Sequence, residues 1–408
     1  MASLSTEMQK TNDTRRNTAS HKFSFSTSNR RPGISQYRLI EDVEDLDRYH
    51  PGGYHPLRIG DELDARYRVI DKLGYGGYST IWLARDLQKA RYVAVKVITA
   101  DASNCSQEAS LISSLGNAPS RPGKGVIPPL IDQFWLAGPN DLHLGNILVQ
   151  FPKVIDHLST SEPHEKLGNP EPEAIVRLNG KPLTDGVPAQ VFIPGWFGVR
   201  SDDIEFGEGI TLSDFGESFN PHISPKFSSK TLPLLQPPEA RFSDEPLSFA
   251  SDIWTLACTI WEIAGQRPLF ETFFPTANRV TAEQVEVLGI LPPEWWGKWS
   301  RRLDWFNEEG ELNLEPGMST RRDFDRRFEY SIQIPRAEAG SETMTAKERR
   351  AFEAMLRSML IYRPNERATA QQVLHSEWMK DWGQPALEQS WNTIQFCHEK
   401  EIESLNQT

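Results

Sequence analysis

The sequence predicts an α+β protein with two lobes, in which strands come first and helices follow. Segments rich in β-branched and aromatic residues, separated by glycines or polar turns, lie between residues 67 and 100. Segments with apolar residues at helical spacing fill the second half of the chain. A run of strands followed by a run of helices is typical of the α+β class, because each kind of element then packs mainly with its own kind.

The composition is that of a soluble globular protein, with 38% hydrophobic and 25% charged residues in a chain of 408. This length suggests two or three structural units. We find no apolar run of about 18 residues and no apolar core at the N-terminus, so we expect neither a transmembrane helix nor secretion. The three cysteines lie far apart, which excludes a disulfide framework and a Cys-type zinc site. A reducing compartment, the cytoplasm, the nucleus or both, fits this pattern.

The charge balance is acidic, with 44 Lys and Arg against 56 Asp and Glu and a net charge of -12. Direct nucleic-acid binding is disfavoured, because contacts to phosphates need Lys and Arg. An acidic surface favours basic partners instead. Acidity that serves solubility alone is the simpler explanation, and both explanations stay open at this point.

Residues 1–40 are predicted to form a disordered tail, because Ser, Thr, Asn and Arg dominate and apolar periodicity is nearly absent. An N-terminal lobe follows over residues 41–137. We expect three strands of an antiparallel meander, then a helix and another strand. These segments are Tyr67–Leu73, Ser79–Ala84, Tyr92–Thr99, Gln107–Leu115 and Ile127–Leu136.

A C-terminal lobe is predicted over residues 138–388, with an insert at about 150–208 and a tail over 389–408. Ser251–Ala264 is apolar nearly all round and predicts a buried helix. Thr345–Ile361 opens on a capping box and then repeats apolar residues at helical spacing. Ala368–Lys380 is predicted to be the closing helix. Glu239, after two prolines, and Arg367 predict a buried ion pair within this lobe.

The first chemical motif is the glycine-rich segment Leu73–Ile81, which lies between two predicted strands. Glycines there would let backbone N–H groups approach phosphate oxygens, because no Cβ intervenes. A glycine-rich hairpin turn with a purely structural role is the alternative. A dinucleotide-binding fingerprint would need a helix after the glycines, whereas Ile81 opens a strand, so a nucleotide-binding oxidoreductase is disfavoured.

The second motif is Lys96, which lies among apolar β-branched residues on the predicted strand Tyr92–Thr99. A buried ammonium group is costly unless it is paired. Glu108, on the following predicted helix, is the natural partner. An edge-strand lysine that faces water is the alternative for an isolated motif, but the glycine-rich segment only one strand earlier favours a functional lysine.

Two later segments carry carboxylates beside apolar strands. Asp141 and Asn146 lie five residues apart before an apolar run, and could place a base and a metal ligand on one loop. Asp214 is followed by Phe215 and Gly216, so that a carboxylate suited to Mg²⁺ precedes a glycine hinge. Each pattern alone is only moderately specific.

Taken in order, these motifs resemble those of the eukaryotic protein kinases. The resemblance covers roughly residues 60–385 and rests on the glycine loop, VAVK, DLHLGN, SDFG, PPE, SDIW and RPNERATA. Finer features resemble the SR-protein kinases, which phosphorylate serine in arginine–serine repeats. These features are YHPGGYHPLRIGDELDARYRVIDKLG, STIWLARD, LGILPPEWWGKWS and a serine, Ser79, at the place of the third loop glycine.

The resemblance implies a bilobal kinase-like fold, ATP and Mg²⁺ as cofactors, and a role for each matched residue. Lys96 would hold the α- and β-phosphates and pair with Glu108, and Asp141 would accept the proton of the substrate hydroxyl. Asn146 and Asp214 would hold Mg²⁺. The residues implied to surround the nucleotide are Leu73, Gly74, Tyr75, Gly76, Gly77, Tyr78, Ser79, Ile81, Ala94 and Lys96.

The sequence departs from the kinase pattern before Asp141. Only 45 positions separate Lys96 from Asp141. In kinases this interval holds the hinge that bonds adenine and two helices of the large lobe, which would need on the order of 50 more residues at typical element lengths. We therefore expect the hinge region and two helices to be missing, and the helix Ser251–Ala264 to be partly uncovered.

The resulting hypothesis is an ATP-dependent serine/threonine kinase that acts on basic Arg/Ser-rich proteins, such as splicing factors, and so bears on mRNA splicing. A catalytically impaired scaffold is the alternative, favoured by the missing hinge. The acidic segment Asp304–Glu311 is a candidate docking site for arginine-rich peptides, and an ordinary solvated loop is its alternative. We expect a monomer that binds neither nucleic acid nor a membrane.

Overall fold

The computed structural model describes residues 35–103, 108–119, 127–138, 141–150, 169–195, 215–265, 267–313 and 322–389, with backbone only for 138 and 141–150. The chain divides into two compact units, one up to Gly216 and one from Glu217 onward. The sequence predicts this boundary at residues 137 and 138 instead. The difference arises because the segments 141–150 and 169–195 fold with the first unit.

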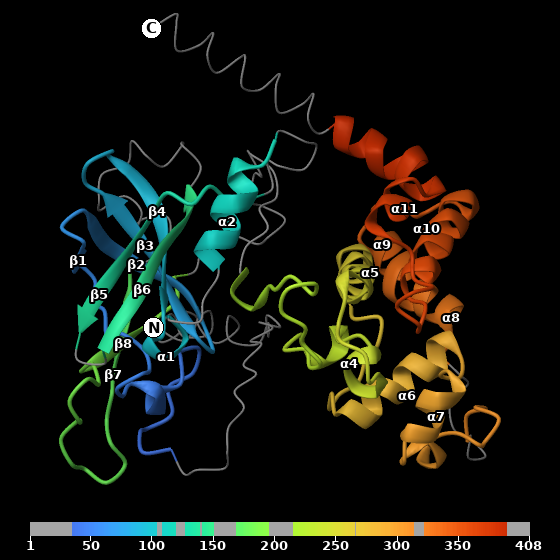
Figure 1. The fold of residues 1–408 in the computed structure, drawn as a ribbon, viewed down its shortest axis with the longest axis horizontal. Coiled ribbons are helices and arrows are strands. Elements are labelled where there is room, and N and C mark those ends of the chain that lie inside the picture. The colour runs from blue at the N-terminus through green and yellow to red at the C-terminus, as the bar shows by residue number, and fades with distance from the viewer. Residues whose placement is uncertain are drawn as a thin grey trace, which may run out of the picture. The chain divides into compact units, whose positions relative to one another are not determined.

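The first unit is built on a six-stranded antiparallel sheet with the order β1-β2-β3-β4-β6-β5 (Figure 1). All three strands of the predicted meander are present as β2, β3 and β4; β2 and β3 end two or three residues later than predicted, and β4 is shifted by one residue toward the N-terminus. The strands are β1 Glu62–Leu63, β2 Tyr67–Gly76, β3 Ser79–Asp86, β4 Arg91–Ile98, β5 Asp132–Gly138 and β6 Asp141–Gln150. β5 replaces the predicted strand Ile127–Leu136 and begins later.

The middle of this sheet is apolar because β4 is buried along its length. Val93, Val95 and Val97 are at most 1% exposed, and they pack in one core with Trp82 of β3 and Phe134 of β5. β-Branched residues suit such a strand because their stiff side chains fit the pleated surface. Two helices follow β4, α1 Ala100–Ser103 and α2 Glu108–Asn117, and the second corresponds to the predicted helix Gln107–Leu115.

A small second sheet in the first unit pairs β7 Glu171–Ala174 with β8 Gln190–Ile193. It packs against the N-terminal segment, where Tyr37, Tyr49 and Tyr54 share a core with Ile175 and Val191. The described part of the predicted insert therefore packs in the first unit and is not an excursion from the C-terminal lobe. The predicted tail 1–40 is also too long, because Tyr37 is buried and its backbone pairs with Arg177; residues 1–34 lie outside the described residues.

The second unit is helical and is organised around α5 Phe249–Gly265, as the sequence predicts. Trp254 and Trp261 of α5 are fully buried and stack or meet edge-on with Phe270 and Phe324. The other helices are α4 Glu239–Phe242, α6 Ala277–Leu288, α7 Pro293–Lys298, α8 Phe324–Phe328, α9 Ile334–Glu338, α10 Ala346–Met359 and α11 Ala370–Leu374. Short helical turns complete the described chain at η1 Leu46–Arg48, η5 Phe215–Glu217, η6 Pro233–Leu235, η7 Arg302–Asp304, η8 Glu329–Gln333 and η9 Met379–Gly383.

Two helix ends differ from the predictions. At Thr345 the side chain accepts a hydrogen bond from the Glu348 backbone N–H, which is half of the predicted capping box. The complete box lies instead at Thr369 and Gln372, where α11 begins. The predicted closing helix Ala368–Lys380 is broken, because α11 ends at Leu374 and the π-helical turn η9 follows at Met379.

One side of α5 carries exposed apolar residues. Leu256 is 43% exposed and Ile263 is 77% exposed, although the opposite side of the helix is buried. These two residues are seven apart and so fall on one face of the helix. Within the described residues, no helix is both long and apolar enough to cross a membrane.

We predict that replacing Leu256 and Ile263 with glutamine reduces binding of a hydrophobic dye and slows aggregation. The melting temperature should change little, because exposed substitutions usually alter stability by less than about 0.5 kcal/mol. The control is Met355→Ala in the buried core, which should cost about 2–5 kcal/mol of unfolding free energy. Unchanged dye binding in the double variant would show that this face of α5 is not the apolar surface that binds the dye.

Candidate functional site

The glycine-rich segment forms the hairpin between β2 and β3. Gly74 pairs with Ile81, and Gly76 with Ser79, so that Gly77 and Tyr78 form the turn. A Cβ built on Gly74 or Gly77 would meet no described atom within 4 Å, which leaves the backbone open to a ligand. A strand follows the turn, as predicted, so the described geometry is not that of a dinucleotide-binding βαβ unit.

Lys96 and Glu108 form the predicted buried ion pair. Lys96 lies on β4, opposite Ile81 of β3, and its Nζ is 3.0 Å from Oε1 and 2.9 Å from Oε2 of Glu108. The side chains are 8% and 0% exposed. Ala94, on the same strand, is also buried. Because both charges have left water, each depends on the other for its stability.

Glu108 also holds the start of the turn η5. The backbone N–H of Phe215 donates a hydrogen bond of 2.9 Å to Glu108 Oε1. One carboxylate therefore connects β4, α2 and the Phe215–Gly216 pair. Sequence reasoning missed this contact, because a backbone donor carries no residue signature. The metal-ligand prediction for Asp214 lies outside the described residues.

The placement of Asp141 and Asn146 contradicts the prediction that they share a loop. Both lie in β6, where Asn146 is the register partner of Lys96 and Asp141 that of Gly138. At about 3.3 Å per strand residue, their Cα atoms are roughly 16 Å apart, too far to act on one reacting group from their backbone positions. The physical reason is that only two residues separate β5 from β6, so the apolar run after Asn146 pairs with the edge of β4.

A third prediction concerns Glu239 and Arg367 in the second unit, and it is confirmed. The guanidinium makes two hydrogen bonds of 2.9 Å to the carboxylate, one to each oxygen. The hydroxyl of Ser251 donates to the same carboxylate at 2.9 Å. Paired charges with further hydrogen bonds are the form in which buried ions are tolerated, so this pair fixes α4 against α5 and the segment before α11.

A second buried ion pair in the first unit was not predicted. Lys72 of β2 pairs with Glu44 of the N-terminal segment, and both side chains are at most 1% exposed. Burial lowers the pKa of Lys72, while the Glu44 charge opposes that shift. Tyr49 donates its hydroxyl to Glu44 at 2.5 Å, and burial followed by the Glu44 charge raises the Tyr49 pKa. The segment around YHPGGYHP was the only sequence signal near this contact.

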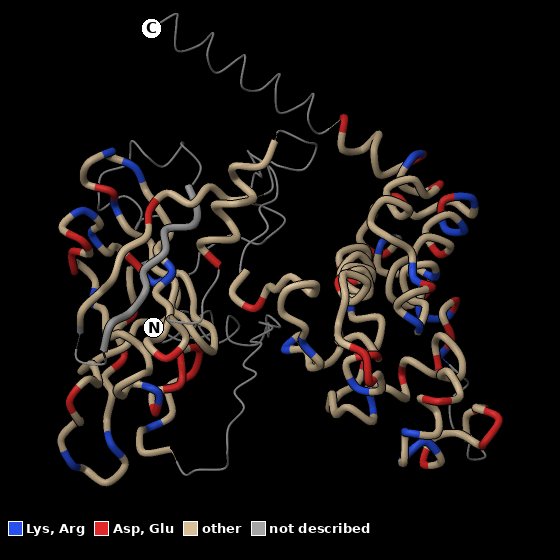
Figure 2. The backbone as a smooth tube through the Cα atoms, viewed as in Figure 1, with Lys and Arg blue, Asp and Glu red and all other residues tan. Residues whose placement is uncertain are grey.

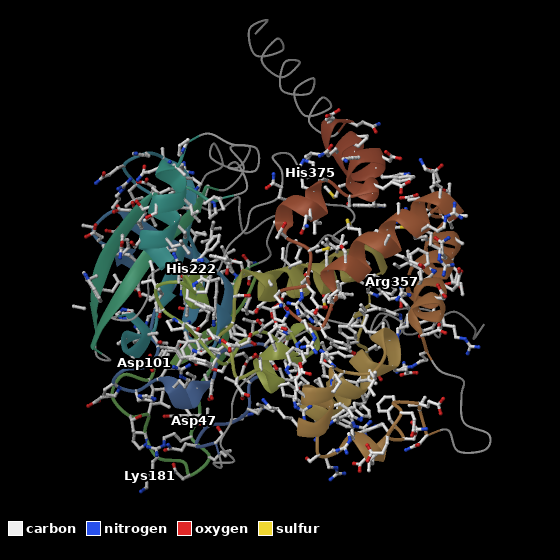
Figure 3. All side chains as sticks on the ribbon, turned by 45° about the vertical axis from the view of Figure 1, so that its right-hand side comes forward. Asp47, Asp101, Lys181, His222, Arg357 and His375 are labelled. Carbon is white, nitrogen blue, oxygen red and sulfur yellow. The ribbon has the colours of Figure 1, made fainter. Side chains whose placement is uncertain are left out.

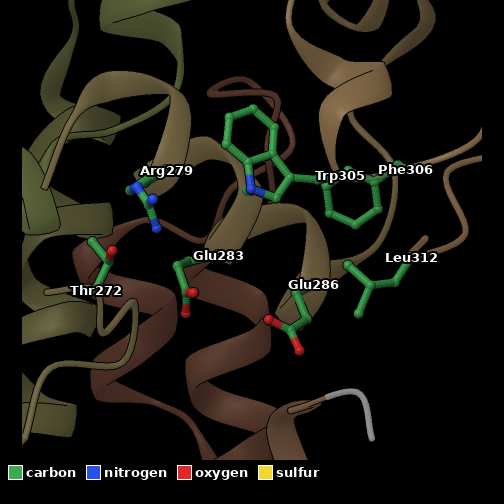
Figure 4. Close-up of a pocket in the computed structure, with 8 residues that line it drawn as sticks. Thr272, Arg279, Glu283, Glu286, Trp305, Phe306 and Leu312 are labelled. Carbon is green, nitrogen blue, oxygen red and sulfur yellow. The ribbon is translucent and has the colours of Figure 1, made fainter. Parts of the chain in front are cut away.

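The second unit contains a small pocket of about 60 Å³ (Figure 4). Arg279, Glu283 and Glu286 of α6 supply its charges, and Trp305, Phe306 and Leu312 its apolar side. Burial raises the pKa of Glu283, an effect that Arg327 opposes from 2.7 Å. Among the described residues, no group of three His, Cys, Asp or Glu side chains lies close enough to hold a metal ion.

Comparison with known proteins gives the family context. No family model matches the chain. A serine/threonine protein kinase of Aspergillus fumigatus is 22% identical over 398 residues, which covers 86% of this chain and 95% of that protein. The chain is thus similar in sequence to proteins that are named serine/threonine protein kinases. SRSF protein kinase 3 of Homo sapiens is 39% identical over 112 residues in the N-terminal region, and spk-1 of Caenorhabditis elegans is 40% identical over 111.

These kinase homologues support the SR-protein kinase type that the motifs indicate. The matched region spans 26% of this chain but only 20% of SRSF protein kinase 3 and 11% of spk-1. The mixed fold, with a curled antiparallel sheet and helices, is compatible with a kinase.

We predict that Lys96→Met destabilises the first unit by about 3–5 kcal/mol, because it leaves Glu108 buried without its cation. The double variant Lys96→Met with Glu108→Gln should recover part of the loss. Asp244→Asn, which breaks an exposed pair with Lys298, serves as the control and should cost less than about 1 kcal/mol. Urea unfolding measures all three, and equal losses for Lys96→Met and Asp244→Asn would contradict the buried pair.

Proposed function

We propose that the chain is an ATP- and Mg²⁺-dependent serine/threonine kinase that phosphorylates serine in basic, Arg/Ser-rich proteins. The observation that carries this proposal is the buried Lys96–Glu108 pair, one strand after the glycine-rich hairpin and tied to Phe215. Splicing factors in the cytoplasm or nucleus are the proposed substrates, and the proposed active form is a monomer.

The residues present fit a nucleotide in part. The open space beside Gly74 and Gly77 would let phosphate oxygens approach the backbone, and Lys96 lies on the strand next to β3. Mg²⁺ would neutralise the charge on the transferred phosphoryl group. By the kinase resemblance, Asn146 and Asp214 would hold it and Asp141 would accept the hydroxyl proton. Asp141 and Asn146 lie in the strand β6 and do not have the loop geometry that these roles require.

That strand placement supports a second candidate function, a catalytically impaired scaffold that binds basic proteins. A chain that keeps Lys96–Glu108 but holds Asp141–Gln150 in its sheet could retain the fold and a partner surface without turnover. The two candidates differ in one measurable respect. Only the kinase transfers phosphate to a peptide in a manner that depends on Asp141.

We predict that the wild-type chain phosphorylates an arginine–serine peptide and that Asp141→Asn lowers the turnover by about 10²–10⁴, the usual contribution of a general base. The affinity for Mg-ATP should stay within twofold, because the base acts on the substrate hydroxyl. Asp185→Asn, at an exposed loop position, is the control. Radiolabel transfer and calorimetry measure the two quantities. Absence of turnover in the wild-type chain, with peptide binding retained, would select the scaffold.

The acidic segment Asp304–Glu311 is the proposed docking site for the basic peptide. Asp304 and Glu308 already pair with Arg301 and Arg302, so a peptide guanidinium would have to displace those arginines. The Glu311 carboxylate accepts a hydrogen bond of 3.0 Å from the neutral side-chain amide of Asn307. The neighbouring pocket adds carboxylates at Glu283 and Glu286, which also face arginines.

We predict that changing Asp304, Glu308, Glu309 and Glu311 to their amides weakens binding of an arginine–serine peptide. Binding to the unchanged chain should fall steeply with salt, since the Debye length shrinks from about 10 Å at 0.1 M to about 3 Å at 1 M. The control replaces the exposed Glu338 and Glu342 with glutamine. Fluorescence anisotropy at low salt measures the affinity for the peptide. Equal peptide affinities of the two variants would contradict the docking role.

A further inference from the structure

The N-terminal segment and the described part of the insert pack against each other, and the N-terminal segment contacts the glycine-rich hairpin. We define the brace as residues 36–54 and its support as residues 171–193, which contain β7 and β8. Leu46, Tyr49 and Tyr54 of the brace share a core with Ile175 and Val191 of the support. Backbone hydrogen bonds join the two further, from Arg38 N–H to the Val176 carbonyl and from Leu178 N–H to the Gln36 carbonyl, both at 2.9 Å.

The brace contacts the hairpin directly through Tyr54. Its hydroxyl donates a hydrogen bond of 2.7 Å to the carbonyl oxygen of Gly76, and the residue is only 2% exposed. Burial raises the pKa of Tyr54 despite the opposing charge of Arg48, so the hydroxyl keeps its proton at neutral pH. The Arg48 guanidinium lies 5.1 Å from the ring of Tyr54 and 5.3 Å from that of Tyr78, within the range of cation–π attraction.

The same brace is anchored to the end of the strand that carries Lys96. The backbone N–H groups of Ala100 and Asp101 donate to the carbonyls of Gly53 and Gly52, at 3.2 and 2.8 Å. Arg48 also pairs with Asp101 at 3.5 Å. Figure 3 marks Asp101 and, on the brace, Asp47. The hairpin tip is bound to the same place, because Thr99 N–H donates to the Tyr78 carbonyl at 2.8 Å.

The base of the hairpin is held by the Glu44–Lys72 pair. The Lys72 ammonium lies 5.5 Å from the ring of Tyr75 and 5.8 Å from that of Trp82, so this buried cation contacts both strands of the hairpin. A glycine-rich turn alone is conformationally free, since its residues have no side chains to pack. Residues outside the hairpin contact it at its base, at the Gly76 carbonyl and at its tip, and these contacts restrict its conformation.

We propose that Tyr54 is a positioning residue that holds the glycine-rich hairpin against the Lys96 strand, and that the insert exists in part to support it. This inference rests on the proposed function for its consequence, which is a pre-organised phosphate site. Ordering the hairpin before binding reduces the entropy lost when a nucleotide binds. Two segments more than 100 residues apart in sequence thereby act on one loop.

The test compares Tyr54→Phe with Tyr67→Phe in the full chain. Tyr67 lies at the opposite end of β2 and donates a comparable 2.7 Å hydrogen bond to Asp132, so each variant loses one largely buried hydroxyl. Hydrogen exchange of residues 74–78 is measured without nucleotide. We expect Tyr54→Phe alone to accelerate this exchange. Equal exchange in the two variants would overturn the brace, whatever the chain's activity.

A second comparison tests the support without touching the hairpin. Val191→Ala in β8 and Val69→Ala in β2 each remove two buried methyl groups, and both residues are at most 2% exposed. Only Val191→Ala should accelerate exchange at residues 74–78. If Val69→Ala has the same effect at these residues, the support is not specific and the role proposed for the insert is wrong.

The consequence for the nucleotide is measured by calorimetric titration with Mg-ATP. Tyr54→Phe should raise the Kd about threefold to tenfold, as expected for one net hydrogen bond, and Tyr67→Phe should leave it within twofold. A looser hairpin with an unchanged Kd would overturn the positioning role. If the wild-type chain binds no nucleotide, the proposed function fails, while the exchange data still decide whether the brace holds the hairpin.

Discussion

The first unit depends on the burial of one charge, the Lys96 ammonium. In the middle of an apolar strand it cannot stay ionised without an anion, and Glu108 supplies one from the start of α2. The position of α2 relative to the sheet is therefore set by an ion pair rather than by apolar contact alone. The remaining hydrogen-bonding capacity of Glu108 then fixes the start of η5 through Phe215. A single carboxylate thus determines where three segments meet.

The edge of β4 imposes the second constraint. A buried strand edge must pair its N–H and C=O groups, and the chain offers β6 for this purpose. Ile147, Leu148 and Val149 have the residue types that strands favour, and β5 is only two residues away. Their local preference for a strand is satisfied here by the nearest unpaired edge, which carries Asp141 and Asn146 into the sheet.

Sequence reasoning reached the elements that local pattern determines. The three strands β2, β3 and β4 and the helices α5 and α10 follow from periodicity, and the partner of Lys96 follows from the cost of burying its charge. Sequence reasoning failed where contacts between distant segments determine the structure. Nothing near Lys72 points to Glu44, 28 residues earlier, and no local signal joins Tyr37 to the sheet of β7 and β8. The sequence predicts a capping box at Thr345, but the complete box lies at Thr369, where the Gln372 side chain also accepts a hydrogen bond from the Thr369 backbone.

Net charge is a weaker guide to partners than the sequence suggests. Many carboxylates of the second unit already have arginine partners, as at Glu283, where both Arg322 and Arg327 lie within 2.8 Å. A carboxylate held in this way contributes little field to a distant peptide, since the nearby cation cancels it. The charge of -12 counts every carboxylate equally. Attraction for a basic chain therefore depends mainly on the acidic side chains that have no arginine partner, and on the work needed to displace the arginines of the others.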